Sequence, residues 1–107
     1  MKFEPMRIKA GTTIVEAGTK PLEVFFLLQG CVESLIHRKF YISGSMFGET
    51  DIIFKRDRLD TYQAKMDCHI LRLHVTIFHQ MMDEFEDIRE DVWVVADQRE
   101  QMRLEQE

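Results

Sequence analysis

The 107-residue sequence predicts a single, mainly β domain closed by C-terminal helices. Short apolar runs separated by turn residues fill the first two thirds of the chain, which is typical of a barrel, sandwich or jelly roll. Polar and apolar residues alternate most clearly in "HILRLHV", residues 69–75. From Thr76 onward the apolar spacing changes to the three-four period of a helix. We therefore expect a β roll over about residues 6–75 and helices over about residues 76–105 of one domain, 1–107.

Each expected strand is a short apolar run bounded by residues that favour turns. In chain order the runs are "MRIKAG", "TIVEAG", "EVFFLLQG", "CVESLIH", "KFYISG" and "TYQAKMDCHILRLHV". Turn signals separate them at Gly11, residues 18–21, Gly30 and Gly44. The last run alternates, and its two expected faces are Ile70, Arg72 and His74 against His69, Leu71, Leu73 and Val75.

Two apolar stripes predict the C-terminal helices. The first, expected to pack into the core, consists of Phe78, Met81, Met82 and Phe85. The second consists of Ile88, Val92, Val95, Arg99 and Met102, opposite a polar face of Glu90, Asp91, Asp97 and Glu100. Arg99 thus lies on an apolar stripe, where it either extends along the helix into water or faces a pocket that holds a polar group. Trp93 lies off the stripe and is a candidate contact for a neighbouring protein.

The composition limits the classes of function. Apolar residues make up 45% of the chain and charged residues 31%, as in ordinary soluble domains. The net charge of −5 opposes a broad phosphate-neutralising surface, so a nucleic-acid polymer is not an expected partner and any bound phosphate should be small. Cys31 and Cys68 predict neither a disulfide framework nor a catalytic thiol. Neither the cysteines nor the four histidines are spaced as metal ligands, so no metal is expected.

The sequence also bears on where the domain works. No apolar run approaches the length that spans a bilayer, and the N-terminus lacks the apolar core of a signal peptide. We therefore expect a cytoplasmic domain without direct membrane insertion. It is expected to be a module of a longer chain, in one interpretation the cytosolic part of a membrane protein.

A glycine, an acid, a short apolar run and an arginine lie close together in residues 46–58, "MFGETDIIFKRDR". The part "ETDIIF" is long enough for one or two helical turns, whose first N–H groups are unpaired and attract a small anion. Gly48 lets a ligand approach the backbone, and Arg58 is suited to hold a phosphate by two parallel hydrogen bonds. Glu49 would repel that phosphate and is better suited to accept a hydrogen bond from a sugar hydroxyl. The set therefore describes a ribose phosphate.

Longer segments carry a family resemblance. They are "AGTTIVEAGTKPLEVFFLLQGCVE", "GSMFGETDIIF", Arg58 and "AKMDCHILRLHVTIF". With these segments the chain resembles the cyclic nucleotide-binding domain from about Arg7 to Arg99. Its C-terminal part is most similar to the version in cyclic-nucleotide-gated and hyperpolarisation-activated ion channels. The resemblance implies a β jelly roll (double-stranded β-helix) with a short phosphate-binding-cassette helix, closed by C-terminal helices.

The resemblance also implies a set of ligand-binding residues. They are Phe47, Gly48, Glu49, Asp51, Arg58, Leu59, Asp60 and Arg99. Glu49 would meet the ribose 2′-hydroxyl, and Arg58 would meet the cyclic phosphate. The backbone at Gly48 and Asp51 would lie near the ligand. Arg99 would approach the base from the lid helix, which gives its place on the apolar stripe a reason.

Leu59 and Asp60 depart from the family, which usually has two small residues here. A carboxylate about 4 Å from the phosphate, at an effective dielectric constant near 20, would cost roughly 4 kcal/mol. Asp60 therefore points to solvent, is offset by neighbouring basic residues, or weakens or abolishes binding. Leu59 lacks the hydroxyl with which related channels hold guanine nucleotides, which slightly favours cAMP over cGMP. The hairpin over residues 30–44 is short for the family, and Tyr41 is a candidate contact to the base.

The sequence leaves alternative functions open. In the first, a regulatory domain without enzymatic activity or further cofactor binds a cyclic nucleotide, and the helix from about Ile88 to Leu104 closes over it. The movement then passes to an effector such as an ion channel. In the second, a degenerate domain serves as a ligand-independent protein-interaction module. A third and weaker alternative, the sensor half of a bacterial transcription regulator, would require a helix-turn-helix segment that is not in the sequence.

Overall fold

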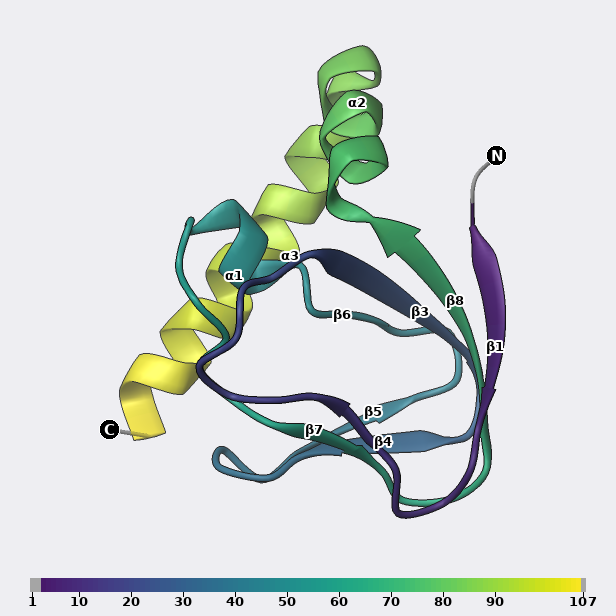
Figure 1. Cartoon of the computed structure of the whole chain (residues 1–107). Helices are drawn as coiled ribbons and strands as arrows, with labels where there is room; N and C mark the ends of the chain where they lie inside the picture. The colour runs from purple at the N-terminus through teal and green to yellow at the C-terminus, as the bar shows by residue number, and fades with distance from the viewer. Residues whose placement is uncertain (1–2, 107) are drawn as a thin grey trace.

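The computed structural model describes residues 3–106, which fold into a β roll with helices at one end (Figure 1). The strands are β1 Glu4–Ile8, β2 Thr13–Val15, β3 Glu23–Gln29, β4 Cys31–Ser34, β5 Lys39–Ile42, β6 Met46–Phe47, β7 Tyr62–Ala64 and β8 Cys68–His74. The helices are α1 Thr50–Ile53, α2 Val75–Glu84 and α3 Glu86–Gln106. The predicted β roll followed by C-terminal helices is confirmed.

The roll consists of two four-stranded antiparallel sheets. One sheet has the order β1-β8-β3-β6 and the other β2-β7-β4-β5, so strands distant in sequence lie side by side. The expected run "TYQAKMDCHILRLHV" is therefore two strands, β7 and β8, which belong to different sheets. The short strand β6 was not expected from the sequence, and it pairs with β3 at Phe25 and Phe26. This arrangement is the predicted jelly roll.

The space between the two sheets is filled by apolar side chains. Its buried members are Val15, Phe25, Leu27, Val32, Phe47, Tyr62, Ala64, Cys68 and Ile70. At its centre Phe47 stacks on Phe25, with ring centroids 5.1 Å apart, and meets the edge of Tyr62 at 5.5 Å. Burial of this kind is the main stabilising contribution to a small domain.

A second apolar cluster joins the outer face of the β3–β8 sheet to the helices. Its buried members are Val24, Ile52, Ile53, Leu73, Phe78, Met82, Val92 and Ala96. Because β8 lies between the roll interior and α2, it buries Ile70 on one face and Leu73 on the other. The alternation in this strand therefore separates two cores rather than a core from solvent.

The first helical stripe is only partly buried. Phe78 and Met82 lie in the second cluster, whereas the Phe85 side chain is 49% exposed. Phe85 follows the last residue of α2 and has an extended backbone (φ −119°, ψ 94°). The expectation that Phe85 packs in the core is therefore wrong, since the helical period on which it rested ends at Glu84.

The second stripe is shifted around α3. The packed face carries Val92, Ala96 and Glu100, while Ile88 and Met102 are exposed. Placing Glu100 on the polar face is thus a wrong prediction. Its burial is explained by the arginines that it meets at the cassette, described below. Trp93 is 44% exposed, as expected, although its ring also meets the edge of Phe54 at 5.7 Å.

Candidate functional site

The loop between β6 and β7, residues 48–61, is called the cassette here. It begins with Gly48 in the left-handed conformation (φ +86°). A Cβ at this position would lie 3.2 Å from Arg58 Nη1 and 3.3 Å from Phe25 Cδ2, so backbone angle and packing both favour glycine. The single turn α1 follows, with Glu49 as its N-cap residue. The helical turn expected after Gly48 is therefore present.

Arg58 is buried at the base of the cassette. Its Nη1 donates a hydrogen bond to the carbonyl oxygen of Gly48 (2.5 Å), and its Nη2 donates to that of Glu23 (2.6 Å). Asp51 Oδ2 lies 3.7 Å from Nη1. Burial lowers the pKa of Arg58, and the negative charge of Asp51 opposes that shift. The guanidinium thus ties the cassette to the start of β3.

Glu49 joins the cassette to α3. Its side chain is fully buried, and Oε1 accepts hydrogen bonds from Arg99 Nη1 and, at 3.3 Å, from Thr50 Oγ1. Among residues 3–106, Glu49 Oε2 has no hydrogen-bond partner. The Arg99 guanidinium also lies over the ring of Tyr41, 5.2 Å from its centroid. Arg99 therefore connects α3 to the cassette and to β5 together.

A second set of ion pairs begins at the next residue of α3, Glu100. Arg56 Nε donates to Asp51 Oδ1 (2.9 Å), and Arg56 Nη1 donates to Glu100 Oε2. Glu100 also accepts a hydrogen bond from Arg103 Nε (2.6 Å). Burial would raise the pKa of the Glu100 carboxyl, but hydrogen bonds from Arg56 and Arg103 hold it below its ordinary value. These contacts account for the buried position of Glu100.

Asp60 is nearly buried, and its carboxylate faces the β4–β5 hairpin. Oδ1 accepts from the backbone N–H groups of Ile36 (2.8 Å) and Thr61 (2.7 Å). Oδ2 accepts from the backbone N–H of His37 (2.9 Å) and lies 2.7 Å from His37 Nδ1. Burial would raise the pKa of Asp60, but these hydrogen bonds lower it overall. Asp60 therefore neither points to solvent nor pairs with Arg56, and the hairpin holds its charge.

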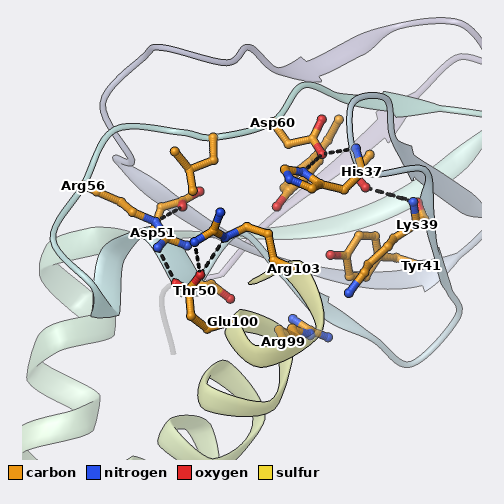
Figure 2. A pocket seen from close by; sticks show the side chains of 13 residues that line it. His37, Lys39, Tyr41, Thr50, Asp51, Arg56, Asp60, Arg99, Glu100 and Arg103 are labelled. Carbon is orange, nitrogen blue, oxygen red and sulfur yellow. Dashed lines mark hydrogen bonds and ion pairs between the residues drawn. The ribbon is translucent and has the colours of Figure 1, made fainter. Parts of the chain in front are cut away.

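A small cavity lies between the cassette, the β4–β5 hairpin and α3. Its volume is about 50 Å³. Figure 2 shows the pairs of Arg56, Asp51 and Glu100 on one side and those of Asp60 and His37 on the other. The lining residues are Ser34, His37, Lys39, Tyr41, Thr50, Asp51, Arg56, Leu59, Asp60, Tyr62, Arg99, Glu100 and Arg103. Burial raises the pKa of both tyrosines in this wall, so their hydroxyls stay protonated.

The family model described as "Cyclic nucleotide-binding domain" matches residues 5–85, more than half of the chain. The chain belongs to this family. No curated protein matches the sequence at a significant level.

Two solved structures illustrate the fold that this cyclic nucleotide-binding domain shares. One is a putative cyclic nucleotide-binding protein from Geobacter metallireducens GS-15, with a TM-score of 0.75 and 16% identity over 95% of this chain and 79% of that one. The other is CLP, a c-di-GMP responsive global regulator of Xanthomonas campestris, with a TM-score of 0.74 and 12% identity over 95% of this chain. The domain spans 54% of that regulator's length. At these identities the likeness extends to the fold alone.

The residues that the sequence singled out fall into two groups. Four of them line the cavity: Asp51, Leu59, Asp60 and Arg99. The other four lie behind its wall: Phe47, Gly48, Glu49 and Arg58. Phe47 is part of the roll core, and Arg58 is bound to backbone carbonyl oxygens.

The cavity is also lined by residues that the sequence analysis did not identify. They are Ser34, His37, Lys39, Thr50, Arg56, Tyr62, Glu100 and Arg103, whereas Tyr41 was a candidate and does line the cavity. The sequence signal that could have identified His37 and Lys39 was the short hairpin over residues 30–44, in which Tyr41 was already a candidate. Within residues 3–106 no cluster of side chains is arranged to hold a metal ion, and no helix is long and apolar enough to cross a membrane.

Proposed function

We propose that this domain binds a cyclic nucleotide and transmits the event through movement of α3 to an attached effector. The observation that carries the proposal is the bond between Arg99 and the fully buried Glu49. It makes the cassette and α3 one connected unit, so that a ligand competing for Glu49 changes the position of α3. A ligand shifts such an equilibrium by its difference in affinity for the two positions.

The proposed ligand contacts are Phe47, Gly48, Glu49, Asp51, Arg58, Leu59, Asp60 and Arg99. A ribose hydroxyl would donate to Glu49 in place of the Arg99 guanidinium, which is then free to face the base. The cavity of about 50 Å³ is far below the roughly 300 Å³ or more of small-molecule sites. Nucleotide entry therefore requires α3 to move away before it settles on the ligand.

The nucleotide preference, the effector and the cellular location are part of the same proposal. Leu59 offers no hydroxyl to guanine, so cAMP is slightly preferred over cGMP. The domain performs no covalent chemistry, and its effector is part of a larger protein such as an ion channel, with the domain on the cytoplasmic side.

Calorimetric titration of the whole chain with cAMP and cGMP tests the proposal. We expect both to bind, with cAMP tighter. Glu49→Gln should weaken binding about tenfold, because a hydrogen bond to a charged acceptor is lost. The matched control is Asp97→Asn on the exposed face of α3, which should leave the affinity unchanged. Absence of binding at millimolar nucleotide would overturn the proposal, and unchanged affinity in Arg58→Ala would remove Arg58 from the contact set.

A specific observation favours the second candidate, a ligand-independent interaction module. Arg58 is occupied by two backbone carbonyl oxygens, and Glu49 is occupied by Arg99. In such a module these contacts are permanent. The melting temperature then stays unchanged when either nucleotide is added, whereas a ligand-binding domain gains stability by mass action.

A further inference from the structure

The cavity has three walls, which are the cassette, the β4–β5 hairpin and α3. The contacts that join two walls are called a joint here. The joint between the cassette and α3 consists of side-chain ion pairs, Glu49 with Arg99 and Arg56 with Glu100. In the joint between the cassette and the hairpin, the donors are mainly backbone N–H groups of the hairpin. The two joints should therefore respond differently to a ligand.

Asp60 is the main acceptor in the joint between the cassette and the hairpin (Figure 2). It is only 5% exposed, and both of its carboxylate oxygens are occupied. Oδ1 accepts from the backbone N–H of Ile36, and Oδ2 accepts from that of His37, whose Nδ1 also lies 2.7 Å from Oδ2. At the next residue, the Thr61 carbonyl oxygen accepts from the backbone N–H of Leu35 at 2.8 Å. The end of the cassette thus holds three consecutive residues of the hairpin turn.

The two joints differ in what their separation would cost. Moving the hairpin away from the cassette would leave a buried carboxylate and several backbone N–H groups without partners, which is strongly unfavourable. Moving α3 away separates Arg99 from Glu49. The Arg99 side chain is 24% exposed, so water can take over its hydrogen bonds, and a ligand hydroxyl can take its place at Glu49. The wall that opens at lower cost is therefore α3.

The hairpin carries an aromatic ring on its cavity side, that of Tyr41 in β5. Aromatic side chains on a cavity wall are suited to stack on a nucleotide base. The Tyr41 ring meets the rings of Phe47 and Tyr62, with centroids 5.7 and 5.8 Å away. Among the described strands, β5 lies at the edge of its sheet and pairs with β4 alone. The position of Tyr41 therefore depends on this ring packing and on how the hairpin turn is attached.

We propose that Asp60 is a positioning residue that fixes the hairpin to the end of the cassette, so that these two walls form one rigid half of the site and α3 alone opens. The inference rests on the proposed function, because it concerns how the same cavity admits a nucleotide. The Asp60 carboxylate acts on the ligand through the hairpin, by setting the position of Tyr41 relative to the cassette. Any direct ligand contact at this position is then left to the backbone.

Hydrogen exchange of the ligand-free whole chain tests the joint itself. Asp60→Ala, which removes both acceptor oxygens, should speed amide exchange of Ile36 and His37 about tenfold, because their N–H groups lose their partners. Asp60→Asn keeps one acceptor oxygen and should give a smaller increase. Asp57→Asn is the matched control, since it changes the charge in the same way at an exposed cassette position outside the cavity lining. Unchanged slow exchange in β8 would show that each variant is folded.

Binding measurements separate positioning from a merely structural role. The two probes are cAMP and methyl β-D-ribofuranoside 3′,5′-cyclic phosphate, which keeps the sugar phosphate but lacks the base. Asp60→Ala should weaken binding of cAMP about tenfold, the lower end of what stacking on one base contributes, and change binding of the second probe less than about twofold. Tyr41→Ala should have a similar effect. Because both changes act on the same contact, the double variant should bind cAMP about as well as either single variant.

The two proposals fail in different ways. If cAMP binds and Asp60→Ala weakens both probes by the same factor, or neither, the positioning role is wrong and the proposed function stands. If no cyclic nucleotide binds, the proposed function is wrong. The joint at Asp60 is then decided by hydrogen exchange alone: it stands if Asp60→Ala speeds exchange at Ile36 and His37, and it is overturned if the rates stay the same.

Discussion

The interior of the β roll and the contact between α3 and the cassette bury different kinds of side chain. Between the sheets the buried residues are apolar, with Phe47 packed between Phe25 and Tyr62. Between α3 and the cassette they include carboxylates, among them Glu49 and Glu100, each held by an arginine. The first region is stabilised by removing apolar surface from water, and the second by charges that must find partners once buried.

This difference distinguishes the β roll, as a fixed frame, from α3, the part that moves in the proposed function. Apolar packing in the roll does not depend on ionisation, so we expect the sheets to keep their shape when ligands or pH change. The position of α3 depends on carboxylates that stay ionised and on arginines that stay with them. Under the proposed function, a ligand that takes one of these partners would therefore act on α3 and leave the roll intact.

The largest expected effect is in the roll. Phe47→Ala should destabilise the protein by about 4 kcal/mol, because it removes a fully buried ring and leaves a cavity. Chemical denaturation measures the loss. Phe85→Ala removes the same ring from a site that is 49% exposed, and it should cost less than about 1 kcal/mol. Similar losses in the two variants would contradict the assignment of Phe47 to the core.

An intermediate effect is expected where α3 meets the cassette. Arg99→Ala should cost about 2 kcal/mol, because it leaves the Glu49 carboxylate buried without its cation. The double variant with Glu49→Gln should lose less than the two single variants together, as urea unfolding will show. Arg89→Ala, which removes an exposed arginine from the same helix, should cost less than about 0.5 kcal/mol. Additive losses would mean that Arg99 and Glu49 do not interact.

The smallest expected effect is on acid stability. The pKa values of Asp60 and Glu100 are lowered from 3.8 and 4.5 by their hydrogen bonds, in spite of burial. Their stabilisation is therefore complete above those ordinary values and is lost as pH falls through the lower folded-state values. When the pH falls from about 5 to about 2, the free energy of unfolding of the double variant Asp60→Asn, Glu100→Gln should decrease by about 1 kcal/mol less than that of the wild type. If the free energy of unfolding depends on pH in the same way in both proteins, these carboxyls do not contribute to acid stability. Asp97→Asn, at an exposed position of α3, is the control.

The sequence predicted local structure better than the packing of the helices. Residue spacing indicated the strands, the turn after Gly48 and the two C-terminal helices, because each depends on neighbours in the chain. It misplaced Glu100, since a buried glutamate becomes favourable only when Arg56, distant in sequence, is folded against it. Phe85 was misplaced because a period of apolar residues does not reveal where the backbone leaves the helix.

The candidate site was predicted in the same uneven way. The cassette residues follow one another in the chain, so a resemblance over a short segment identified them together. His37 and Lys39 come from a hairpin that reaches the cavity only when β4 pairs with β5 and β7. The solvent-facing alternative for Asp60 failed because two of its hydrogen-bond donors, the backbone N–H groups of Ile36 and His37, lie more than twenty residues away. Contacts of this range require the fold.

The length of α3 has a mechanical consequence. The helix packs against α2 near Val92 and meets the cassette at Arg99, but continues to Gln106. At 1.5 Å per residue, Arg99 lies about 10 Å and Gln106 about 21 Å from that packing point. A rigid rotation of about 10° around Val92 thus moves Arg99 by about 2 Å and Gln106 by about 4 Å. In the proposed movement, the far end of the helix would work as a lever that doubles the displacement at the pocket.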